Sequence, residues 1–345
     1  MTFSPLNKIF ILTSLGFIVA LSFTPMLIAF LKSRKMGKQI RNDGSTPLYS
    51  KLHQAKAGTP TMGGLLIWGT LVAIMFLFWL FDRVLHIGGF DFLDFYSRRE
   101  TLLPLGALVG ASVVGAIDDW MDIRQRGHKK RGLRFRYKLI LYTVVAAIGA
   151  WWFYFKLGFN AIHIPFWGGL YLGWFFIPFF VLAVVGISSA VNLTDGLDGL
   201  AGGALLMSFV AYGLIAFLQG KYDLAAFIGV ISGALLAFLW FNVFPARFFM
   251  GDTGSMGLGV LLAVIAFLTN SLVILLFIGF IFFLEALSFF LQLIWRKLFK
   301  RKLFLSAPIH HHLQARGWPE AQITMRFWII ALVMSIIGVV MYFLG

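Results

Sequence analysis

The sequence predicts an all-α polytopic membrane protein, and three observations carry this prediction. Hydrophobic residues make up 60% of the 345 residues. Charged residues make up only 12%, whereas soluble domains carry about 25%. Stretches of about 20 apolar residues recur from one end of the chain to the other, and each is long enough to cross a bilayer as a helix.

About ten apolar stretches are candidate transmembrane helices, and no soluble segment of domain size interrupts them, so residues 1–345 form a single membrane domain. The first stretch is too long for the apolar core of a cleaved signal peptide, which favours a retained helix. Residues 156–173 combine aromatic side chains with Pro165 and a Gly-Gly pair, which predicts a hairpin at the membrane surface. The candidate helices are residues 8–31, 62–81, 102–117, 138–157, 174–191, 200–218, 223–240, 255–269, 272–295 and 326–344.

The basic residues predict the orientation of these helices. Most of the 29 lysines and arginines lie in the segments 32–61, 118–138 and 296–326, which follow alternate stretches. Basic loops remain in the cytoplasm. We therefore expect both termini to face outward and the acidic motifs described below to lie on the cytoplasmic face.

Composition also excludes two kinds of site and one class of partner. The chain has no cysteine, so it forms neither disulfides nor thiolate metal sites. The net charge of +15 is high enough to suggest nucleic acid, but no recognisable nucleic-acid-binding module is present. We expect membrane lipid, and no nucleic acid, as a partner.

The first acidic motif is GAIDDWMDIR, where Asp118 and Asp119 end the third stretch. Consecutive residues of a helix point about 100° apart, so these two carboxylates do not face one substrate atom in the same way. We interpret one as a base or metal partner and the other as the group that orients it. The alternative is an ordinary acid pair at a helix end among basic residues.

The second motif, NLTDGLDGLAGG, places Asn192, Asp195 and Asp198 three residues apart. This spacing puts all three near one helical face, and the glycines let the backbone approach a ligand closely. A loop that only joins two helices needs neither two carboxylates nor these glycines. The motif therefore favours a substrate site.

The third motif is FFMGDTGSMG, where Asp252 lies in a turn that opens the next stretch. Such a turn offers backbone N–H groups to an anion, and its carboxylate can hold Mg²⁺. Carboxylates at the edge of a bilayer, among many cations, fit a magnesium–diphosphate site. Oxygen ligands favour Mg²⁺ or Mn²⁺ over metals that bind thiolate or imidazole.

Two basic segments add candidate anion contacts. In HQAKAGTPTMGG, Lys56 and Thr61 stand beside glycines at the entry to the second stretch. In RFRYKLI, Lys138 starts the fourth stretch. The alternatives are a basic loop at the membrane surface for the first segment and a lysine that only extends toward the interface for the second.

The ninth stretch carries a polar stripe, because Glu285, Ser288 and Gln292 follow helical spacing. A carboxylate inside a membrane is costly and by default marks a lined cavity or a site. The alternative is a contact between packed helices.

Three consecutive histidines, His310, His311 and His312, stand in LSAPIHHHLQARGWPE. They are not an affinity tag, because only three occur and a full apolar stretch follows them. A zinc site is disfavoured, because neighbouring side chains diverge and four ligands are the rule. Imidazoles on the cytoplasmic side can bind diphosphate or carbohydrate oxygens. We expect His311, and then His312, to face substrate; the alternative is a histidine-rich surface loop.

The motifs together resemble those of the phospho-N-acetylmuramoyl-pentapeptide transferase family, within the polyprenyl-phosphate N-acetylhexosamine-1-phosphate transferase superfamily. The matching segments are KAGTPTMGG, AIDDW, NLTDGLDGLAGG, NVFPARFFMGDTGS and APIHHHLQARGWPE, in this order over essentially the whole chain. The family also has ten spans with both ends outside. One departure is visible, because Leu313 and Gln314 replace the Phe-Glu that commonly follows the histidines.

The resemblance implies transfer of phospho-MurNAc-pentapeptide from UDP-MurNAc-pentapeptide to undecaprenyl phosphate in the bacterial cytoplasmic (inner) membrane. The products are lipid I and UMP, and the cofactor is Mg²⁺. A lipid phosphate is mostly ionised at neutral pH, since its second pKa is about 6, so a strong base is not required. Direct attack is favoured, and a covalent aspartyl-phosphate intermediate stays open.

Residue roles follow by motif. The resemblance implies that Asp252 is the magnesium ligand and that Asp118 and Asp119 deprotonate or orient the lipid phosphate. His311 is the fourth residue predicted to be catalytic. The predicted substrate-binding residues are Lys56, Thr61, Lys138, Asn192, Asp195, Asp198, Asn242, Phe249, Ser255, Gln292, His310 and His312.

Two rival functions remain open. A sister enzyme would move GlcNAc-1-phosphate onto the same lipid carrier. A lipid transporter or flippase would line a cavity with anion contacts but would not need clustered magnesium carboxylates. The sequence also leaves the oligomeric state open, a homodimer included.

Overall fold

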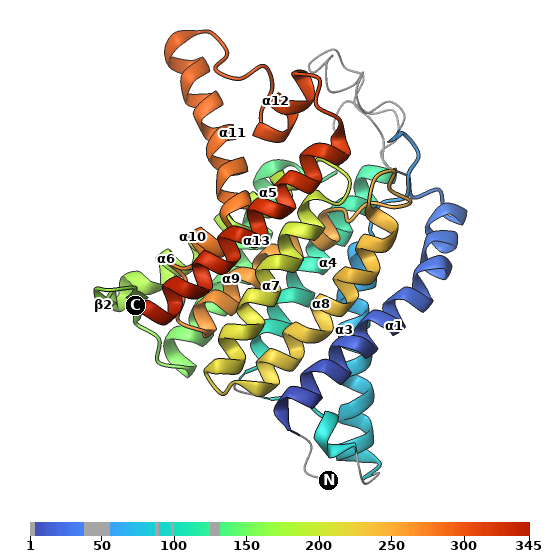
Figure 1. The fold of residues 1–345 in the computed structure, drawn as a ribbon, viewed down its shortest axis with the longest axis vertical. Coiled ribbons are helices and arrows are strands. Elements are labelled where there is room, and N and C mark those ends of the chain that lie inside the picture. Colours follow the sequence, from blue (N-terminus) through green and yellow to red (C-terminus); the bar gives the residue numbers. More distant parts are fainter. Residues whose placement is uncertain (1–3, 38–55, 87–89, 98–99, 125–131) are drawn as a thin grey trace.

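The computed structural model describes residues 4–37, 56–86, 90–97, 100–124 and 132–345. The basic segments 38–55 and 125–131, which contribute to the predicted orientation, lie outside the described residues. Almost all regular structure in the described part of the chain is helical, which confirms the predicted all-α class (Figure 1). Eight of the described helices are long and apolar enough to cross a membrane.

The predicted hairpin is present as an antiparallel pair, β1 (Ala161–Ile164) and β2 (Gly168–Tyr171). Short 3-10 segments, η3 (Asp91–Leu93) and η5 (Gly173–Phe175), precede α4 and α6. The eight long helices are α1 (Pro5–Ser33), α3 (Gly64–Trp79) continued by η2 (Leu80–Val84), α4 (Leu102–Arg124), α5 (Phe135–Trp151) continued by η4 (Trp152–Lys156), α6 (Phe176–Thr194), α7 (Leu200–Leu218), α8 (Tyr222–Asn242) and α13 (Glu320–Leu344).

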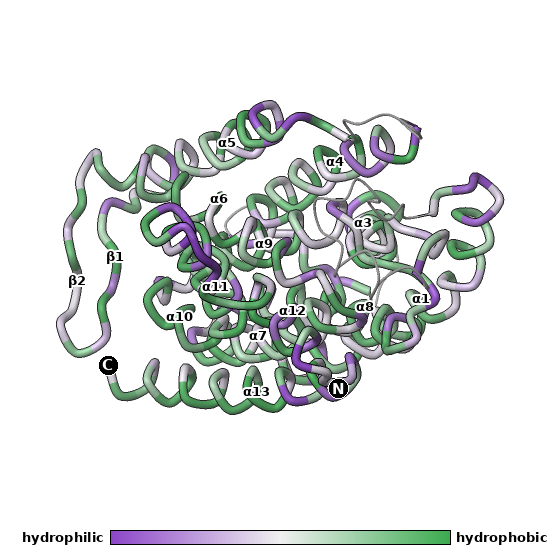
Figure 2. The backbone as a smooth tube through the Cα atoms, turned by 90° about the horizontal axis from the view of Figure 1, so that it is seen from above, coloured by the Kyte–Doolittle hydropathy of each residue, from purple (hydrophilic) through white to green (hydrophobic). Residues whose placement is uncertain are grey.

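A shorter apolar helix, α9 (Asp252–Leu268), forms the centre of the bundle. Every residue of α9 after Asp252 is buried. α9 packs against α3, α4, α6 and α7, which surround it in Figure 2. The start of α9 is therefore held on several sides, which makes it a rigid place for a functional side chain.

The predicted continuous span 272–295 is wrong in one respect, because the chain breaks at Gly279. A short helix, α10 (Leu275–Ile278), precedes the break, and α11 (Phe280–Phe299) follows it. Gly279 has φ −97° and ψ 20°, outside the α-helical region. α11 then leans away from the bundle (Figure 1). The short helix α12 (Ile309–Ala315) packs beside the first half of α11, at Glu285 and Ser288.

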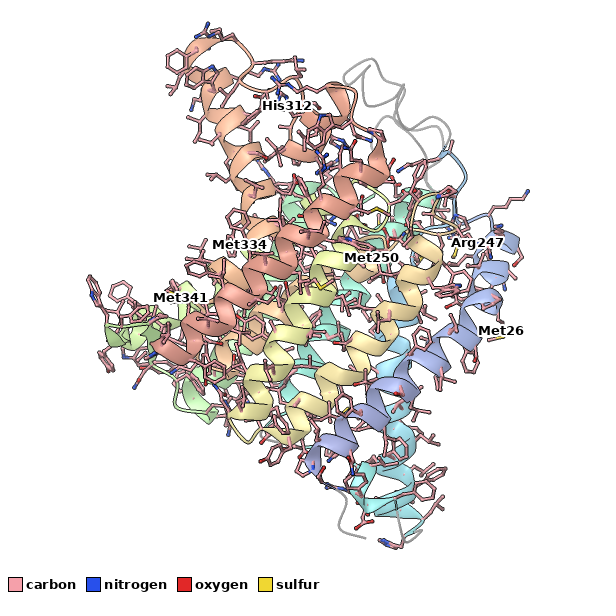
Figure 3. All side chains as sticks on the ribbon, viewed as in Figure 1. Met26, Arg247, Met250, His312, Met334 and Met341 are labelled. Carbon is pink, nitrogen blue, oxygen red and sulfur yellow. The ribbon has the colours of Figure 1, made fainter. Side chains whose placement is uncertain are left out.

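The two ends of the bundle differ in chemistry. The start of α1 and the end of α13 both lie away from α12 (Figure 1). The acidic motifs, the histidine segment and the start of α9 gather at the α12 end. Figure 3 shows His312 at that end, whereas Met341 lies toward the other.

Candidate active site

Asp252 begins α9, and its position is fixed by Asp119 of α4. The backbone N–H groups of Asp252 and Thr253 donate to the two carboxylate oxygens of Asp119, at 3.1 and 3.0 Å. Gly251 precedes them with φ 71°, a conformation that favours glycine. Asp119 thus caps a helix to which it does not belong, and a carboxylate at a helix N-terminus is electrostatically favoured.

Asp118 points elsewhere, as the 100° separation of neighbouring residues predicts. Its Oδ2 atom accepts from Lys138 Nζ at 3.1 Å, and its Oδ1 atom accepts from the Leu133 N–H at 2.6 Å. Lys138 also forms an ion pair with Asp252 Oδ2. One ammonium group of α5 therefore bridges the carboxylates of α4 and α9.

Asn192, at the end of α6, completes this group. Its Nδ2 donates to Asp252 Oδ1 and to Ser255 Oγ, both at 2.8 Å. We call Asp118, Lys138, Asn192, Asp252 and Ser255 the acidic cluster. Four helices contribute to it, so only the assembled bundle creates it.

A second group surrounds Lys56, and we call Lys56, Asp198 and Glu320 the lysine cluster. Lys56 Nζ lies 2.6 Å from Asp198 Oδ1 and forms a second ion pair with Glu320. Glu320 also accepts the Asp198 N–H at 2.7 Å, and the Ala246 N–H donates to Asp198 Oδ2 at 3.0 Å. The Lys56 ammonium stands 5.9 Å from the centre of the Phe249 ring.

Glu320 is the residue that sequence reasoning missed. The motifs give it no role, although it lies in the first turn of α13, where an acid is electrostatically favoured. The structure brings it to Lys56 from a position far along the chain. No sequence spacing connects the two residues, so only the tertiary fold reveals the pair.

Several predicted substrate contacts hold the backbone of the site. Asn242 is buried; its Oδ1 accepts the Gly199 N–H at 3.0 Å, and its Nδ2 donates to the Phe248 carbonyl at 2.8 Å. Thr61 is buried beside Gly251, since a Cβ atom added there would lie 2.8 Å from Thr61 Oγ1. The prediction that Asn192, Asp195 and Asp198 share one helical face is wrong, because α6 ends at Thr194 and the two aspartates lie in the turn that follows.

The polar stripe of α11 binds the segment that carries the histidines. Gln292 accepts the N–H groups of Leu303 and Phe304, at 3.0 and 2.9 Å, and Ser288 accepts the Ile309 N–H at 2.9 Å. Glu285 binds the ring of His310. The predicted contact of Gln292 with substrate stays a prediction, because in this structure its oxygen already accepts these two backbone groups.

The three histidines have different hydrogen-bond partners, although the ring centres of His310 and His311 lie only 4.1 Å apart. His310 is fully buried against Glu285. His311 Nδ1 lies 3.0 Å from Gln314 Oε1, so the position at which the chain departs from the family motif contacts the histidine predicted to be catalytic. His312 Nδ1 accepts the Leu305 N–H at 3.1 Å.

Comparison with known proteins assigns the family. A model for "Phospho-N-acetylmuramoyl-pentapeptide-transferase signature 1" matches residues 56–67, and a model for "Glycosyl transferase family 4" matches residues 101–270. A phospho-N-acetylmuramoyl-pentapeptide-transferase of Chloroflexus aggregans is 39% identical over 342 residues, covering 95% of this chain and 88% of that protein. The enzyme of the same name from Geobacillus kaustophilus is 38% identical over 339 residues, covering 97% and 98%.

The chain belongs to the phospho-N-acetylmuramoyl-pentapeptide transferase family. The transferase signature begins at Lys56 and includes Thr61, and the longer match includes the whole acidic cluster. The histidine segment lies outside both matched ranges, although the full-length relatives cover it.

In this transferase the ring of His312 is expected to titrate below pH 6.5. Partial burial and the nearby Arg316 guanidinium lower the pKa of His312 from its ordinary value of 6.5. The neutral ring also keeps the Nδ1 lone pair that accepts the Leu305 N–H. Protonation removes this bond, so its contribution to stability is lost as pH falls below about 6.5.

Histidine NMR titration measures this directly, with His312→Gln identifying the signal. A midpoint at or above 6.5 would contradict the placement of His312 in the structure.

Proposed function

We propose that this transferase moves phospho-MurNAc-pentapeptide from UDP-MurNAc-pentapeptide to undecaprenyl phosphate, forming lipid I and releasing UMP. The observation that supports it most is the acidic cluster, in which Lys138 joins Asp118 and Asp252 at the start of α9. Family membership supplies the reaction class. The cluster supplies the Lys138 ammonium as a cation for a diphosphate, and two carboxylates that would hold a divalent metal.

The reaction demands positioning more than a strong nucleophile. An oxygen of the lipid phosphate attacks the phosphorus that bears the sugar, and the bond from this phosphorus to the UMP oxygen breaks. The lipid phosphate is largely ionised at neutral pH, so Asp118 orients and desolvates it rather than generating a nucleophile. We assign direct attack, with Asp119 as a positioning residue that holds the start of α9.

The donor set of the acidic cluster fits Mg²⁺. Asp118 and Asp252 turn carboxylate oxygens toward one ammonium, and the Asn192 side chain is adjacent. No group of three or more His, Asp or Glu side chains suited to a metal occurs among the described residues. Mg²⁺ commonly takes only one or two carboxylates and completes its shell with water and substrate phosphates. When bound by Asp252 and Asp118, it would neutralise diphosphate charge.

Lys138 and a divalent ion are expected to compete for these carboxylates. Lys138→Met removes the ammonium but keeps the apolar stem, so both carboxylates become available to a cation. We expect Mn²⁺ to bind about tenfold more tightly, because one opposing charge in the site shifts affinity by at least about 1.4 kcal/mol. Transfer is expected to fall, since Lys138 is also proposed to bind phosphate.

Electron paramagnetic resonance of Mn²⁺ measures the affinity without turnover. Lys297→Met is the matched control for Lys138→Met, because it removes one lysine charge at the far end of α11. Equal or weaker Mn²⁺ binding by Lys138→Met would show that the ammonium and the metal do not share a site.

The remaining predicted residues divide between the two clusters. Lys56 and Phe249 are proposed to hold the nucleotide end of the substrate, and Asp198 and Glu320 hold Lys56 in place. His311 is proposed to contact the diphosphate or the sugar from α12. Asn242 is proposed to support the site by holding the backbone at Gly199 and Phe248, and Thr61 and Asp195 are proposed as further substrate contacts.

We also propose that the α12 end faces the cytoplasm of the bacterial inner membrane, with both termini outside and ten membrane passages in all. Because the chain has no cysteine, each single-cysteine variant carries one thiol. In spheroplasts, an impermeant maleimide is expected to label Trp167→Cys, in the exposed hairpin, and to label Lys302→Cys only after lysis. The reverse pattern would invert the topology. A homodimer is retained as a proposal, and mass photometry of the purified protein tests it.

The decisive assay is UMP release by purified protein. We expect release to require Mg²⁺, UDP-MurNAc-pentapeptide and polyprenyl phosphate together. Turnover of UDP-GlcNAc in place of the muramoyl substrate would refute the proposed donor and support the sister enzyme.

A further inference from the structure

A carboxylate and an imidazole form a completely buried pair between α11 and α12. His310 Nδ1 lies 2.9 Å from Glu285 Oε2, and both side chains have 0% exposure. Burying a charged or polar group is costly unless it has partners. An apolar side chain would fill a helix contact at less cost, so the pair points to a role beyond packing.

The other edge of the His310 ring faces the second acidic motif. A Cβ atom added to Gly196 would lie 2.3 Å from His310 Nε2, so the ring packs directly on the backbone between Asp195 and Asp198. Within the described residues, neither His310 Nε2 nor Glu285 Oε1 has a hydrogen-bond partner. Gly196 is thus the position at which the histidine helix contacts the motif that supplies Asp198.

We propose that Glu285 is a positioning residue, which fixes the tautomer and orientation of His310 so that His310 holds the turn from Asp195 to Asp198. This inference rests on the proposed function, because the turn carries Asp198 of the lysine cluster. It gives His310 an indirect role in place of the predicted contact with substrate.

The chemistry of the pair explains the choice of residues. An ionised carboxylate accepts hydrogen bonds and donates none, so it holds the hydrogen on Nδ1 whether the ring is neutral or charged. In the neutral ring, Nε2 then carries no hydrogen where it packs against Gly196. A glutamine has nearly the same size but can accept or donate, and so it does not select a tautomer.

The first experiment compares Glu285→Gln with Glu285→Asp. We expect Glu285→Gln to lower kcat about 10- to 100-fold, by analogy with partners that orient metal-bound histidines, while its melting temperature stays near that of the wild type. Glu285→Asp retains a carboxylate and is expected to recover most of the lost rate. Ser335→Ala, which removes a buried hydroxyl from α13, is the control and is expected to keep full activity.

Nitrogen-15 NMR of labelled histidines provides a readout that packing alone does not move. In the wild type, His310 is expected to carry its hydrogen on Nδ1, and in Glu285→Gln to show both tautomers. Wild-type kcat in Glu285→Gln, or an unchanged tautomer despite lost activity, would overturn the proposal.

The second experiment tests the contact with Gly196 through a double-mutant cycle. Gly196→Ala is expected to lower the melting temperature in the wild-type background and much less in His310→Ala, where the ring is absent. Equal losses in both backgrounds would overturn the contact. The NMR and melting measurements need no turnover, so they remain decisive even if the wild type fails to release UMP, which would refute the proposed function alone.

Discussion

Replacement of Asp252 by asparagine is expected to reduce UMP release about 1000-fold. The change removes one of two carboxylates that face the proposed metal, and metal stabilisation of phosphoryl transfer is worth several kcal/mol, with about 1.4 kcal/mol for each tenfold. It also removes the ion pair that holds Lys138 against α9. The fold is expected to survive, because the asparagine keeps the shape of the side chain and the Asp119 cap binds only backbone groups.

Asp91→Asn is the matched control, because Asp91 is an exposed carboxylate in η3, outside both clusters. The two variants are compared by the rate of UMP release and by Mn²⁺ binding. If Asp252→Asn retained more than about a tenth of the wild-type rate, Asp252 would not be the central carboxylate.

Gly115→Ala, which adds one methyl group, is expected to lower the rate of UMP release nearly as much as Asp252→Asn does, and also to lower stability. A Cβ atom there would lie 2.3 Å from the Asp252 carbonyl oxygen and 2.5 Å from its carbonyl carbon. Backbone cannot swing aside as a side chain can, so α4 and α9 must separate. Overpacking of this kind costs about 1–3 kcal/mol, and displacement of a reacting group by 1 Å can cost about 100-fold in rate.

Gly110→Ala on the same helix is the control. Its Cβ atom would lie 3.7 Å from a methyl group of Val145, an ordinary contact, and alanine favours helix more than glycine does. Thermal unfolding in detergent and UMP release are measured for both. A Gly115→Ala protein with wild-type melting and activity would show that the two helices are not closely packed beneath Asp252.

The helices and their boundaries were largely predictable because the bilayer imposes a length and a composition on each one. The eight long helices overlap the predicted stretches, although α4 continues to Arg124 beyond the predicted end at 117 and α13 begins at Glu320 before the predicted start at 326. The break at Gly279 was not predictable in this way, because residues on both sides of it are apolar and hydropathy does not register one non-helical backbone position. The hairpin was found because Pro165 and the paired glycines are local turn signals.

The candidate site was predicted as a set of residues but not as an arrangement. The sequence named Asp118 and Asp119 together, and local helical geometry required that they diverge. It did not show that Asp119 caps α9 while Asp118 meets Lys138. Glu320 received no role, since its partner Lys56 lies at the other end of the chain.

The sequence by itself determined the class of the fold, the membrane-spanning helices, the family and the residue types of the site. These follow from local properties, namely hydropathy, spacing and ordered motifs. The tertiary structure alone decided which lysine pairs with which carboxylate. It also decided that Asn192 contacts Asp252 whereas Asn242 holds the backbone of the site. Only the tertiary structure shows that His310 is buried against Glu285 and Gly196. The physical reason is that each of these contacts joins helices far apart in the chain, and their partners are set by packing around α9 rather than by any spacing along the sequence.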